Sequence, residues 1–397
     1  MCGIAGFVND MPIDVKCPVL QRMTDMIAHR GPDSEGHYID EHAALGHRRL
    51  SIIDLGGGQQ PIYNEDGSKV ITFNGEIYNY QTLREELIAA GHTFTTKSDT
   101  EVLLHGYEQW GMDLLQRVRG MFTFVIWDKN KQELFGARDH FGIKPFYYAK
   151  MNGTFMYASE IKSLLRHPDF VKELNAEALK PYMTFQYPAI GETFFKGVYK
   201  LPEGHYFTYR DGKMDIHRYY DEDFREGKQK LGELVNSIDQ TVCDSVKAHQ
   251  IADVEVGSFL SSGVDSSYVA AVARPQHTYS IGFGKGTYNE SQQAGELAEL
   301  LKLNNTAESL TDEEAFAAFP RIQWHLDEPD SNPSCVPLYF LSALAAKDVK
   351  VVLSGEGADE LFAGYIDYGV HTKFRPIKEV TRWLTHLPAG ARKAIAR

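Results

Sequence analysis

The chain has 397 residues, of which 43% are hydrophobic and 24% are charged. This composition is that of a globular protein and excludes a mainly disordered or fibrous chain, and the length predicts two or three domains. The net charge of −13 disfavours a binder of duplex nucleic acid or of an anionic membrane, because affinity for phosphate backbones depends on Lys and Arg. That charge is still compatible with one local site for a small anion such as a nucleotide.

Targeting signals and cysteine chemistry are also constrained by the sequence. No apolar run approaches the roughly 20 residues that a membrane-spanning helix needs. Asp10 and Asp14 interrupt the apolar residues near the start, where a basic region is also missing, so we expect no secretory signal. The cysteines are too widely spaced to favour a disulfide framework or a zinc site, and we expect reduced thiols and a cytoplasmic protein. They are Cys2, Cys17, Cys243 and Cys335.

The first half predicts an α+β layered domain. After an apolar, glycine-rich strand over residues 1–7, short runs rich in β-branched and aromatic residues alternate with Gly, Asn and Asp. These runs cover 45–54, 69–74, 122–128, 133–139 and 154–159, and 195–209 resembles a further hairpin. Two helices are expected at 79–90 and 100–110, the second capped by Ser98 or Asp99.

A charged segment without a clear period, 219–230, separates this half from a second half of different character. There, predicted strands alternate with predicted helices, which favours a parallel α/β sheet whose ligands bind beyond the carboxyl ends of the strands. The strands are expected at 254–260, 277–283 and 349–353, and the helices at 231–249, 266–273, 291–301, from about 359, and 383–396.

Cys2 directly follows the initiator methionine, so loss of Met1 would place a thiol beside a free α-amine. An α-amine titrates at a pKa of about 7.7–8.0, and it can therefore act as the base for the nucleophile of its own residue. A cysteine at position 2 can also occur by chance in a frayed chain end. The apolar run at 1–7 favours a buried strand, which supports the nucleophile hypothesis.

Other polar residues of the first half can bind charged or polarised groups. Asn74 and Gly75 follow a predicted strand, where an Asn side chain and a Gly N–H can form an oxyanion hole, although Asn-Gly alone is typical of a hairpin turn. Two arginines can hold a carboxylate and two aspartates an ammonium group, although each is also consistent with a surface ion pair. These charged residues are Arg30, Arg49, Asp33 and Asp99.

Five motifs follow one another in about a hundred residues: CGIAG from Cys2, HRGPD from His29, RLSI from Arg49, FNGEIYN from Phe73 and SDTE from Ser98. Together they resemble the class II glutamine amidotransferase domain, an N-terminal-nucleophile hydrolase with a four-layer αββα fold. The resemblance implies that Cys2 attacks the amide of glutamine and releases ammonia, with its α-amine as the base.

The same resemblance implies the other roles in glutamine hydrolysis. Asn74 and the Gly75 N–H would stabilise the tetrahedral oxyanion, and Asn74 would also contribute to glutamine binding. Arg49 would hold the α-carboxylate of glutamine. Asp99 would bind the α-amino group, with Glu76 nearby.

The run from Phe259 to Ser267 follows a predicted strand and enters a predicted helix. Its serine hydroxyls, its glycine and the first N–H groups of the helix can bind a phosphate group, and Asp265 can ligate Mg²⁺. A serine-rich helix cap without a ligand explains the same residues equally well. The chain contains no Walker A motif and no GxGxxG motif.

This run resembles the pyrophosphate loop, SGGxDSS, of adenylating ATP pyrophosphatases, except that Ser262 stands where the pattern has Gly. Serine fits there only if φ need not be positive. The run SGEGADE from Ser354 resembles a motif of asparagine synthetase-type domains. By these resemblances Asp265 and Asp359 would coordinate Mg²⁺, and Glu356 would handle the ammonia proton. The implied ATP-binding residues are Leu260, Ser261, Ser262, Gly263, Asp265, Ser266, Ser267, Ile281, Ser354 and Gly355.

Nearly the whole chain resembles the glutamine-hydrolysing asparagine synthetases. The resemblance implies ATP-dependent amidation of a carboxylate, most simply aspartate, through an acyl-adenylate, with AMP and pyrophosphate as products. Glutamine, ATP and Mg²⁺ would be required, the segment from Asp327 to Pro337 would lie near the acceptor, and homodimers occur among relatives. Because water would destroy the adenylate, we expect an apolar passage for ammonia between the domains.

We therefore expect an αββα amidotransferase domain over 2–210, a linker over 211–230 and an α/β ATP-pyrophosphatase domain over 231–397. Members of the family are usually longer, so the last domain is expected to be C-terminally truncated. Two alternatives stay open: an amidotransferase of the same family acting on a cell-wall, sugar-acid or peptide carboxylate, and a glutaminase-bearing regulatory or partner-binding protein whose synthetase half is inactive.

Overall fold

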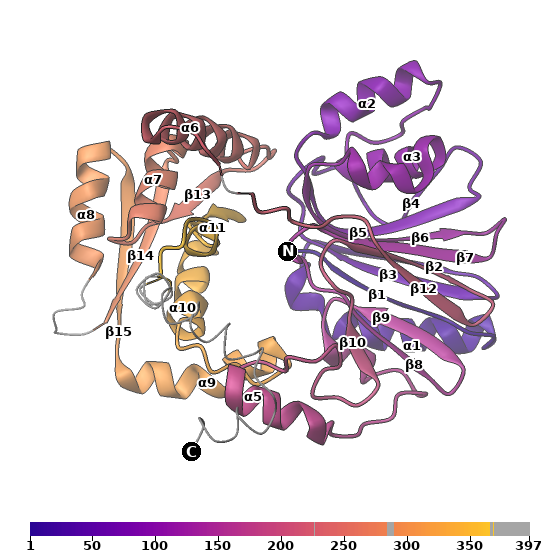
Figure 1. Cartoon of the computed structure of the whole chain (residues 1–397). Coiled ribbons are helices and arrows are strands. Elements are labelled where there is room, and N and C mark those ends of the chain that lie inside the picture. The colour runs from indigo at the N-terminus through magenta and orange to yellow at the C-terminus, as the bar shows by residue number, and fades with distance from the viewer. Residues whose placement is uncertain (226, 284–289, 366–367, 369–397) are drawn as a thin grey trace, which may run out of the picture.

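The computed structural model describes residues 1–225, 227–283, 290–365 and 368, and it divides the chain into two halves that face each other (Figure 1). The strands of the first half are β1 (Gly3–Val8), β2 (Ser34–Ile39), β3 (Ala43–Arg49), β4 (Ile62–Tyr63), β5 (Lys69–Ile77), β6 (Gly120–Asp128), β7 (Glu133–Arg138), β8 (Tyr147–Met151), β9 (Thr154–Ala158), β10 (Val198–Lys200), β11 (His205–Arg210) and β12 (Lys213–Arg218). Its α-helices are α1 (Ile13–Asp25), α2 (Tyr80–Ala89), α3 (Asp99–Trp110), α4 (Ile161–Leu164) and α5 (Leu179–Phe185).

The first half has the predicted four-layer αββα architecture. One six-stranded sheet has the order β10-β8-β9-β1-β3-β2 and the other has the order β12-β11-β7-β6-β5-β4. The two sheets pack face to face over a core that contains Ile4, Leu45, Val125 and Trp127. Helix α1 covers the outer face of the first sheet, and helices α2 and α3 cover the outer face of the second sheet (Figure 1).

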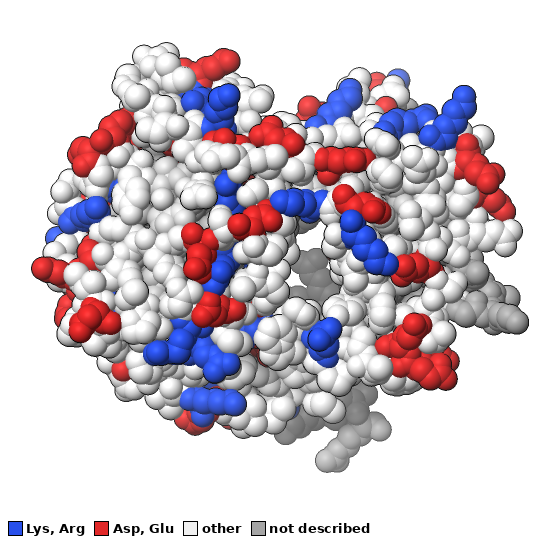
Figure 2. All heavy atoms as spheres, turned by 180° about the vertical axis from the view of Figure 1, so that it is seen from behind, with Lys and Arg blue, Asp and Glu red and all other residues white. Residues whose placement is uncertain are grey.

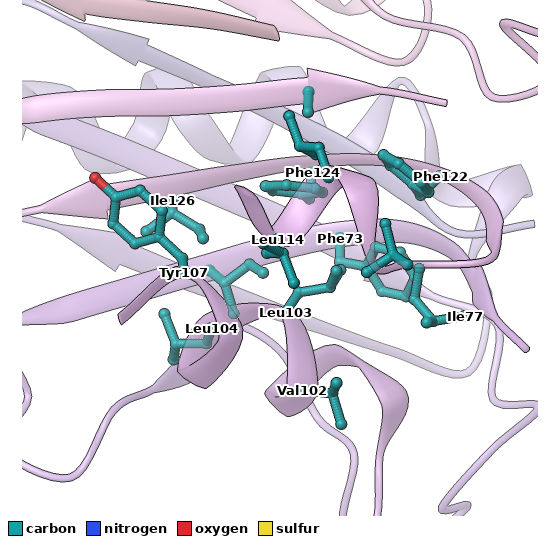
Figure 3. Close-up of a cluster of buried hydrophobic side chains, with 14 of the residues drawn as sticks. Phe73, Ile77, Val102, Leu103, Leu104, Tyr107, Leu114, Phe122, Phe124 and Ile126 are labelled. Carbon is teal, nitrogen blue, oxygen red and sulfur yellow. The ribbon is translucent and has the colours of Figure 1, made fainter. Parts of the chain in front are cut away.

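Helix α3 begins as the sequence predicts, because the Ser98 side chain accepts a hydrogen bond from the Thr100 N–H. Its apolar side chains pack against the second sheet, where Leu103 and Tyr107 lie close to Phe124 (Figure 3). This packing fixes the rotation of the helix. It therefore also fixes the position of Asp99, which lies in the first helical turn and is buried.

The second half is built on a four-stranded parallel sheet with the order β15-β14-β13-β16. Its strands are β13 (Val256–Phe259), β14 (His277–Phe283), β15 (Asn304–Leu310) and β16 (Val351–Leu353). Its helices are α6 (Leu231–Ala248), α7 (Val264–Ala273), α8 (Glu290–Leu301), α9 (Asp312–Leu326), α10 (Cys335–Ala345) and α11 (Ala358–Phe362). The chain leaves β13 toward β14 on one side and returns to β16 on the other, so the topological switch point lies between β13 and β16.

Three details differ from the sequence prediction. The segment 195–209 is no hairpin, because β10 pairs with β8 in one sheet and β11 pairs with β7 and β12 in the other. Strand β12 lies inside the expected linker, so the first half extends at least to Arg218. Asn74 and Gly75 lie within β5 and not at its end, because β5 continues to pair with β6 as far as Ile77. The helix expected at 383–396 falls outside the described residues.

On the face shown in Figure 2, acidic and basic side chains are interspersed over both halves, and the surface is hollowed between the halves. This distribution differs from the single basic patch that is typical of nucleic-acid-binding surfaces. Among the described residues, no helix is both long and apolar enough to cross a membrane.

Candidate functional site

A cavity of about 1180 Å³ lies between the two halves and is lined by residues of both. The first half contributes Cys2, Arg49, Asn74, Gly75, Glu76 and Asp99, and the second half contributes Asp265, Ser354, Gly355 and Glu356. The structure thus brings candidate residues of the amidotransferase motifs and of the ATP-binding motifs to the same cavity. Much of the remaining lining is apolar, including Ile52, Val242, Val246, Val269 and Leu353.

Cys2 is held at the start of β1 by contacts with residues far along the chain. Its Sγ lies 3.4 Å from the Leu50 N–H, which donates to it, and 3.6 Å from the Leu50 carbonyl, to which the thiol can donate. The Arg30 Nε donates a 2.9 Å hydrogen bond to the Cys2 carbonyl. Burial raises the pKa of the Cys2 thiol. The resting thiol is therefore protonated at neutral pH, and it requires a nearby base before it can act as a nucleophile.

An amine lies beside this thiol. In the described chain the amine belongs to Met1, and burial, with a further contribution from Arg30, lowers the pKa of its ammonium group to about 5 even though the thiol of Cys2 opposes the shift. An amine in this position is therefore unprotonated at neutral pH. Lys144, which sequence reasoning missed, also lines the cavity, and burial lowers its pKa to about 8.

Two donors beside Cys2 are suited to an oxyanion. The Asn74 amide is buried, and neither its nitrogen nor its oxygen has a hydrogen-bond partner. The Phe73 N–H donates to the Gln60 side chain and the Ile77 N–H to Asp99, so both point away from β6. Backbone N–H groups of a strand point to alternate sides, so those of Phe73, Gly75 and Ile77 point to the same side. The Gly75 N–H therefore points toward the cavity.

The space at Gly75 leaves no room for a larger residue. A Cβ there would lie 2.3 Å from the Met121 carbonyl oxygen, across the pair with β6. Glycine thus allows the backbone of β5 to run close to its neighbour while its N–H remains available. The hairpin-turn interpretation of Asn74 and Gly75 is wrong, and the oxyanion-hole interpretation remains compatible with the geometry.

Charged groups on the wall of the cavity suit a zwitterionic ligand. Burial raises the pKa of Asp99 to about 6, and burial together with the nearby Asp99 carboxylate raises the pKa of Glu76 well above its usual value. A cation placed between them would relieve this cost. The Arg49 guanidinium is buried and held by the carbonyl oxygens of Ile53 at 3.0 Å and Asp54 at 2.7 Å, so its orientation is fixed.

On the second half, two turns meet at the carboxyl ends of the neighbouring strands β13 and β16. A Cβ on Gly355 would lie 2.7 Å from the Ser266 nitrogen and 2.8 Å from the Asp265 Cβ, so the turn after β16 packs against the start of α7. Within the serine loop, the Ser261 and Ser266 hydroxyls lie 2.8 Å apart, and the Ser267 hydroxyl donates to the Gly263 carbonyl at 2.6 Å. Ser262 is not among the residues with positive φ, so serine is tolerated at this position.

Not every candidate of the second half reaches the cavity. Asp265, Ser354, Gly355 and Glu356 line it, whereas the remaining candidates do not. Those outside its lining are Leu260, Ser261, Ser262, Gly263, Ser266, Ser267, Ile281 and Asp359. The serine loop nevertheless adjoins Asp265 directly. Carboxylate oxygens at the start of α7 and α11 fit the hard oxygen ligands that Mg²⁺ prefers.

Two charged residues of the motifs have other partners than the sequence suggested. Arg30 holds the Cys2 carbonyl and, through Nη1, the Glu160 carboxylate at 2.9 Å, and it does not line the cavity. Asp33 accepts hydrogen bonds from the Ser51 N–H at 2.8 Å and from Lys350 of the second half at 2.5 Å. Arg30 and Asp33 therefore support the site and the contact between the halves.

Comparisons with known proteins agree with this division of the chain. Residues 1–220 match the family model of the glutamine amidotransferase domain, and residues 237–394 match that of asparagine synthase. Asparagine synthetase [glutamine-hydrolyzing] 1 of Bacillus subtilis is 42% identical over 403 residues, which is 100% of this chain and 62% of the relative. A putative asparagine synthetase of Mycobacterium bovis is 38% identical over 100% of this chain and 64% of its own length. A putative asparagine synthetase 2 of Methanocaldococcus jannaschii is 34% identical over 93% of this chain and 76% of its own length.

Proposed function

Because the chain belongs to the glutamine-hydrolysing asparagine synthetase family, we propose that it amidates a carboxylate, most simply that of aspartate, with ammonia released from glutamine and with ATP as the activating substrate. The chain spans a little less than two thirds of the length of two of these relatives, 62% and 64%. The observation that carries the proposal is the shared cavity, since Cys2 and Glu356 line the same space from opposite halves.

In the first half, glutamine would bind as a zwitterion. Its α-carboxylate would meet the fixed Arg49 guanidinium, and its α-ammonium would lie between Asp99 and Glu76, whose buried carboxylates are costly to ionise without a cation. The side-chain amide would then reach Cys2. Loss of Met1 would leave the α-amine of Cys2 in the enclosed environment that keeps an amine neutral at this position.

The α-amine would take the thiol proton as Cys2 Sγ attacks the amide carbon of glutamine. The negative charge that develops on the carbonyl oxygen would be stabilised by the Asn74 amide and the Gly75 N–H. The proton would pass to the departing nitrogen, which leaves as ammonia. Water would then hydrolyse the thioester on Cys2 and release glutamate.

In the second half, an oxygen of the acceptor carboxylate would attack the α-phosphorus of ATP, and pyrophosphate would leave. The serine loop between β13 and α7 would hold the phosphates through its hydroxyls and the first N–H groups of α7. Asp265 and Asp359 would hold Mg²⁺, which supplies charge neutralisation on the phosphates when bound. Ammonia would attack the acyl carbon, Glu356 would accept its proton, and AMP would leave.

The two reactions need a route that excludes water from the adenylate. The cavity that Cys2 and Glu356 share has a largely apolar lining, which supports a passage along its wall. Ammonia is small and neutral, so an apolar wall would not retain it. The cavity thus supports a direct transfer between the halves.

The proposal is tested by incubating the protein with Mg-ATP, glutamine and aspartate and following asparagine, AMP and glutamate by mass spectrometry. Asparagine and AMP formed in equal amounts are expected. Glutamate without AMP would contradict aspartate as the acceptor, and the same assay with cell-wall, sugar-acid and peptide carboxylates would then identify another acceptor or establish an inactive synthetase half.

A further inference from the structure

We propose that Glu65, His92, His105 and Glu108 form a binding site for a divalent transition-metal ion, of which Zn²⁺ is the best match. The site lies on the first half, outside the cavity between the halves. Each residue offers one ligand atom, and the four atoms lie within 4.8 Å of one another. Two imidazole nitrogens and two carboxylate oxygens are a ligand set typical of zinc.

Three separate segments bring these side chains together. Glu65 lies between β4 and β5, His92 follows α2, and His105 and Glu108 lie on α3. A spacing of three residues places His105 and Glu108 on the same face of α3. Because α3 is fixed by its packing on the sheet (Figure 3), the two ligands on it are held in place before any ion binds.

Three distances between histidine and glutamate atoms of the cluster are close to those of tetrahedral coordination. The Nδ1 atom of His92 lies 3.2 Å from Glu65 Oε1, and the Nδ1 atom of His105 lies 3.4 Å from Glu65 Oε2 and 3.2 Å from Glu108 Oε2. Zinc bonds of about 2.0–2.2 Å in a tetrahedron place neighbouring ligand atoms about 3.3–3.6 Å apart. Because the four ligand atoms lie within 4.8 Å of one another, the widest pair would have to close by at most about 1.5 Å around an ion.

Both histidine rings are turned so that Nδ1 faces the carboxylates of the cluster. The Nε2 atom of His92 lies 3.3 Å from Gln109 Oε1, whereas that of His105 is buried without a hydrogen-bond partner and has Glu101 Oε1 at 3.5 Å. An acceptor such as Gln109 can hold the proton on Nε2 of His92 and leave its Nδ1 lone pair for a metal. Metal-bound histidines are almost always held in this way.

The two carboxylates are also held from outside. Glu65 Oε1 accepts from the Thr93 N–H at 3.0 Å. Glu108 Oε1 accepts from Asn64 at 2.7 Å and from Lys69 at 3.3 Å, which leaves Oε2 directed to His105. A plain ion-pair network would explain the contacts within the cluster, and metal binding distinguishes the two interpretations. The two carboxylates would balance the charge of a divalent ion bound to the imidazoles.

The site is connected to the glutamine pocket through α3. Asp99, which faces the cavity, lies in the first turn of this helix, and the ligands His105 and Glu108 lie in its later turns. An ion would join α3 to the segments that follow β4 and α2. Its expected effect is to stabilise this part of the first half and to keep Asp99 in position.

The test is zinc binding to the full chain by isothermal titration and by metal content after dialysis. One zinc ion per chain is expected for the unchanged protein. His92→Gln should weaken the affinity for zinc at least about tenfold, because it removes one of the four ligands. The substitution leaves no cavity in the hydrophobic core, since His92 is partly exposed. His42→Gln is the matched control, since His42 also pairs with a carboxylate, Asp10, at 3.4 Å but lies outside the cluster.

Replacing zinc with Co²⁺ distinguishes metal binding at this site from metal binding at a cysteine. The Co²⁺-loaded protein should show the visible bands of tetrahedral cobalt without the near-ultraviolet band of a thiolate ligand. A thiolate band, no retained zinc, or equal zinc affinity of the unchanged protein and His92→Gln would each overturn the proposal. Because these readouts are independent of glutamine hydrolysis and of ATP, the outcome is distinguishable from failure of the proposed enzymatic function.

Discussion

Lys162 of the first half makes a 2.9 Å ion pair with Asp327 of the second half, and these side chains are only 4% and 7% exposed. Lys162 also contacts Glu160 at 2.5 Å, and Glu160 accepts a hydrogen bond from Arg30 at 2.9 Å. Arg30 in turn donates to the carbonyl of Cys2. A continuous chain of polar contacts therefore joins the backbone of Cys2, the proposed nucleophile, to the end of α9.

The segment at the end of α9 is docked by further contacts with the first half. The Ile161 N–H donates to Asp327 at 2.6 Å, and the Phe194 N–H donates to Glu328 at 3.0 Å. By its resemblance to the family, this segment is proposed to lie near the acceptor. These contacts connect the segment to Arg30 and Cys2 through charged groups that cannot lose their partners without cost.

Lys162→Met should destabilise the protein by about 3–5 kcal/mol, because it leaves the Glu160 and Asp327 carboxylates buried without their shared cation. Chemical denaturation at neutral pH measures this difference. Lys196→Met is the control, since Lys196 pairs with Glu173 in solvent and its loss should change stability by less than about 1 kcal/mol. Equal effects of the two substitutions would show that the buried chain of charges does not stabilise the contact between the halves.

Cys2→Ala should reduce glutamine-dependent synthesis by at least about 10³-fold and leave ammonia-dependent synthesis intact, because only the first reaction needs the nucleophile. An N-terminal extension that prevents loss of Met1 should have the same effect, since it blocks the α-amine. Cys17→Ala, at an exposed cysteine, is the control. Normal glutamine hydrolysis by the extended protein would contradict the role of the α-amine.

Much of the fold could be predicted because local patterns agree with the tertiary structure. The strand β14 coincides with its predicted range, 277–283, and the Ser98 cap of α3 follows from a polar residue directly before an apolar helical pattern. The proposed glutamine site could be predicted for the same reason, as its residues lie in short contiguous motifs. The structure then brings Cys2, Asn74, Glu76 and Asp99 to one cavity.

Other features could not be predicted, because they depend on partners far away in the chain. The Asn-Gly pair resembles a turn, yet β5 continues through it because Gln60 and Asp99 satisfy the N–H groups of Phe73 and Ile77 on the side away from β6. No local pattern distinguishes 195–209 from a hairpin, although its two strands join different sheets. The partners of Arg30 and Asp33, in the same way, come from distant segments.

Asp99→Asn should stabilise the protein without ligand at neutral pH, because burial raises the pKa of the Asp99 carboxyl and makes its ionisation unfavourable. A carboxyl group whose pKa is raised by folding destabilises the folded protein at pH values above its folded-state pKa. At pH values below its unfolded-state pKa it has no effect on stability. The gain, on the order of 1–3 kcal/mol, should therefore vanish as the pH falls to about 4. Denaturation at both pH values checks this sign.

The same substitution should raise the KM for glutamine about tenfold to a hundredfold, because hydrogen bonds to charged groups contribute about 1.5–3 kcal/mol. In the unchanged protein, the KM should also rise on acidification, as protonation of Asp99 removes the partner of the substrate ammonium. Asp211→Asn, at an exposed aspartate, serves as the control for both measurements. A KM that is insensitive to Asp99→Asn would contradict its contact with glutamine.

Asp265→Asn should lower ATP-dependent pyrophosphate release about 10²-fold or more, because Asp265 would hold Mg²⁺ on the phosphates. It lies in the first turn of α7, where the serine loop meets the turn after β16. Basal glutamine hydrolysis should persist, since Cys2 and its oxyanion donors belong to the other half. Asp312→Asn is the matched control, as Asp312 occupies the first turn of α9 but does not line the cavity. Unchanged pyrophosphate release in Asp265→Asn would remove Asp265 from the proposed ATP site, whereas simultaneous loss of glutamine hydrolysis would show that the substitution disturbs the shared cavity as a whole.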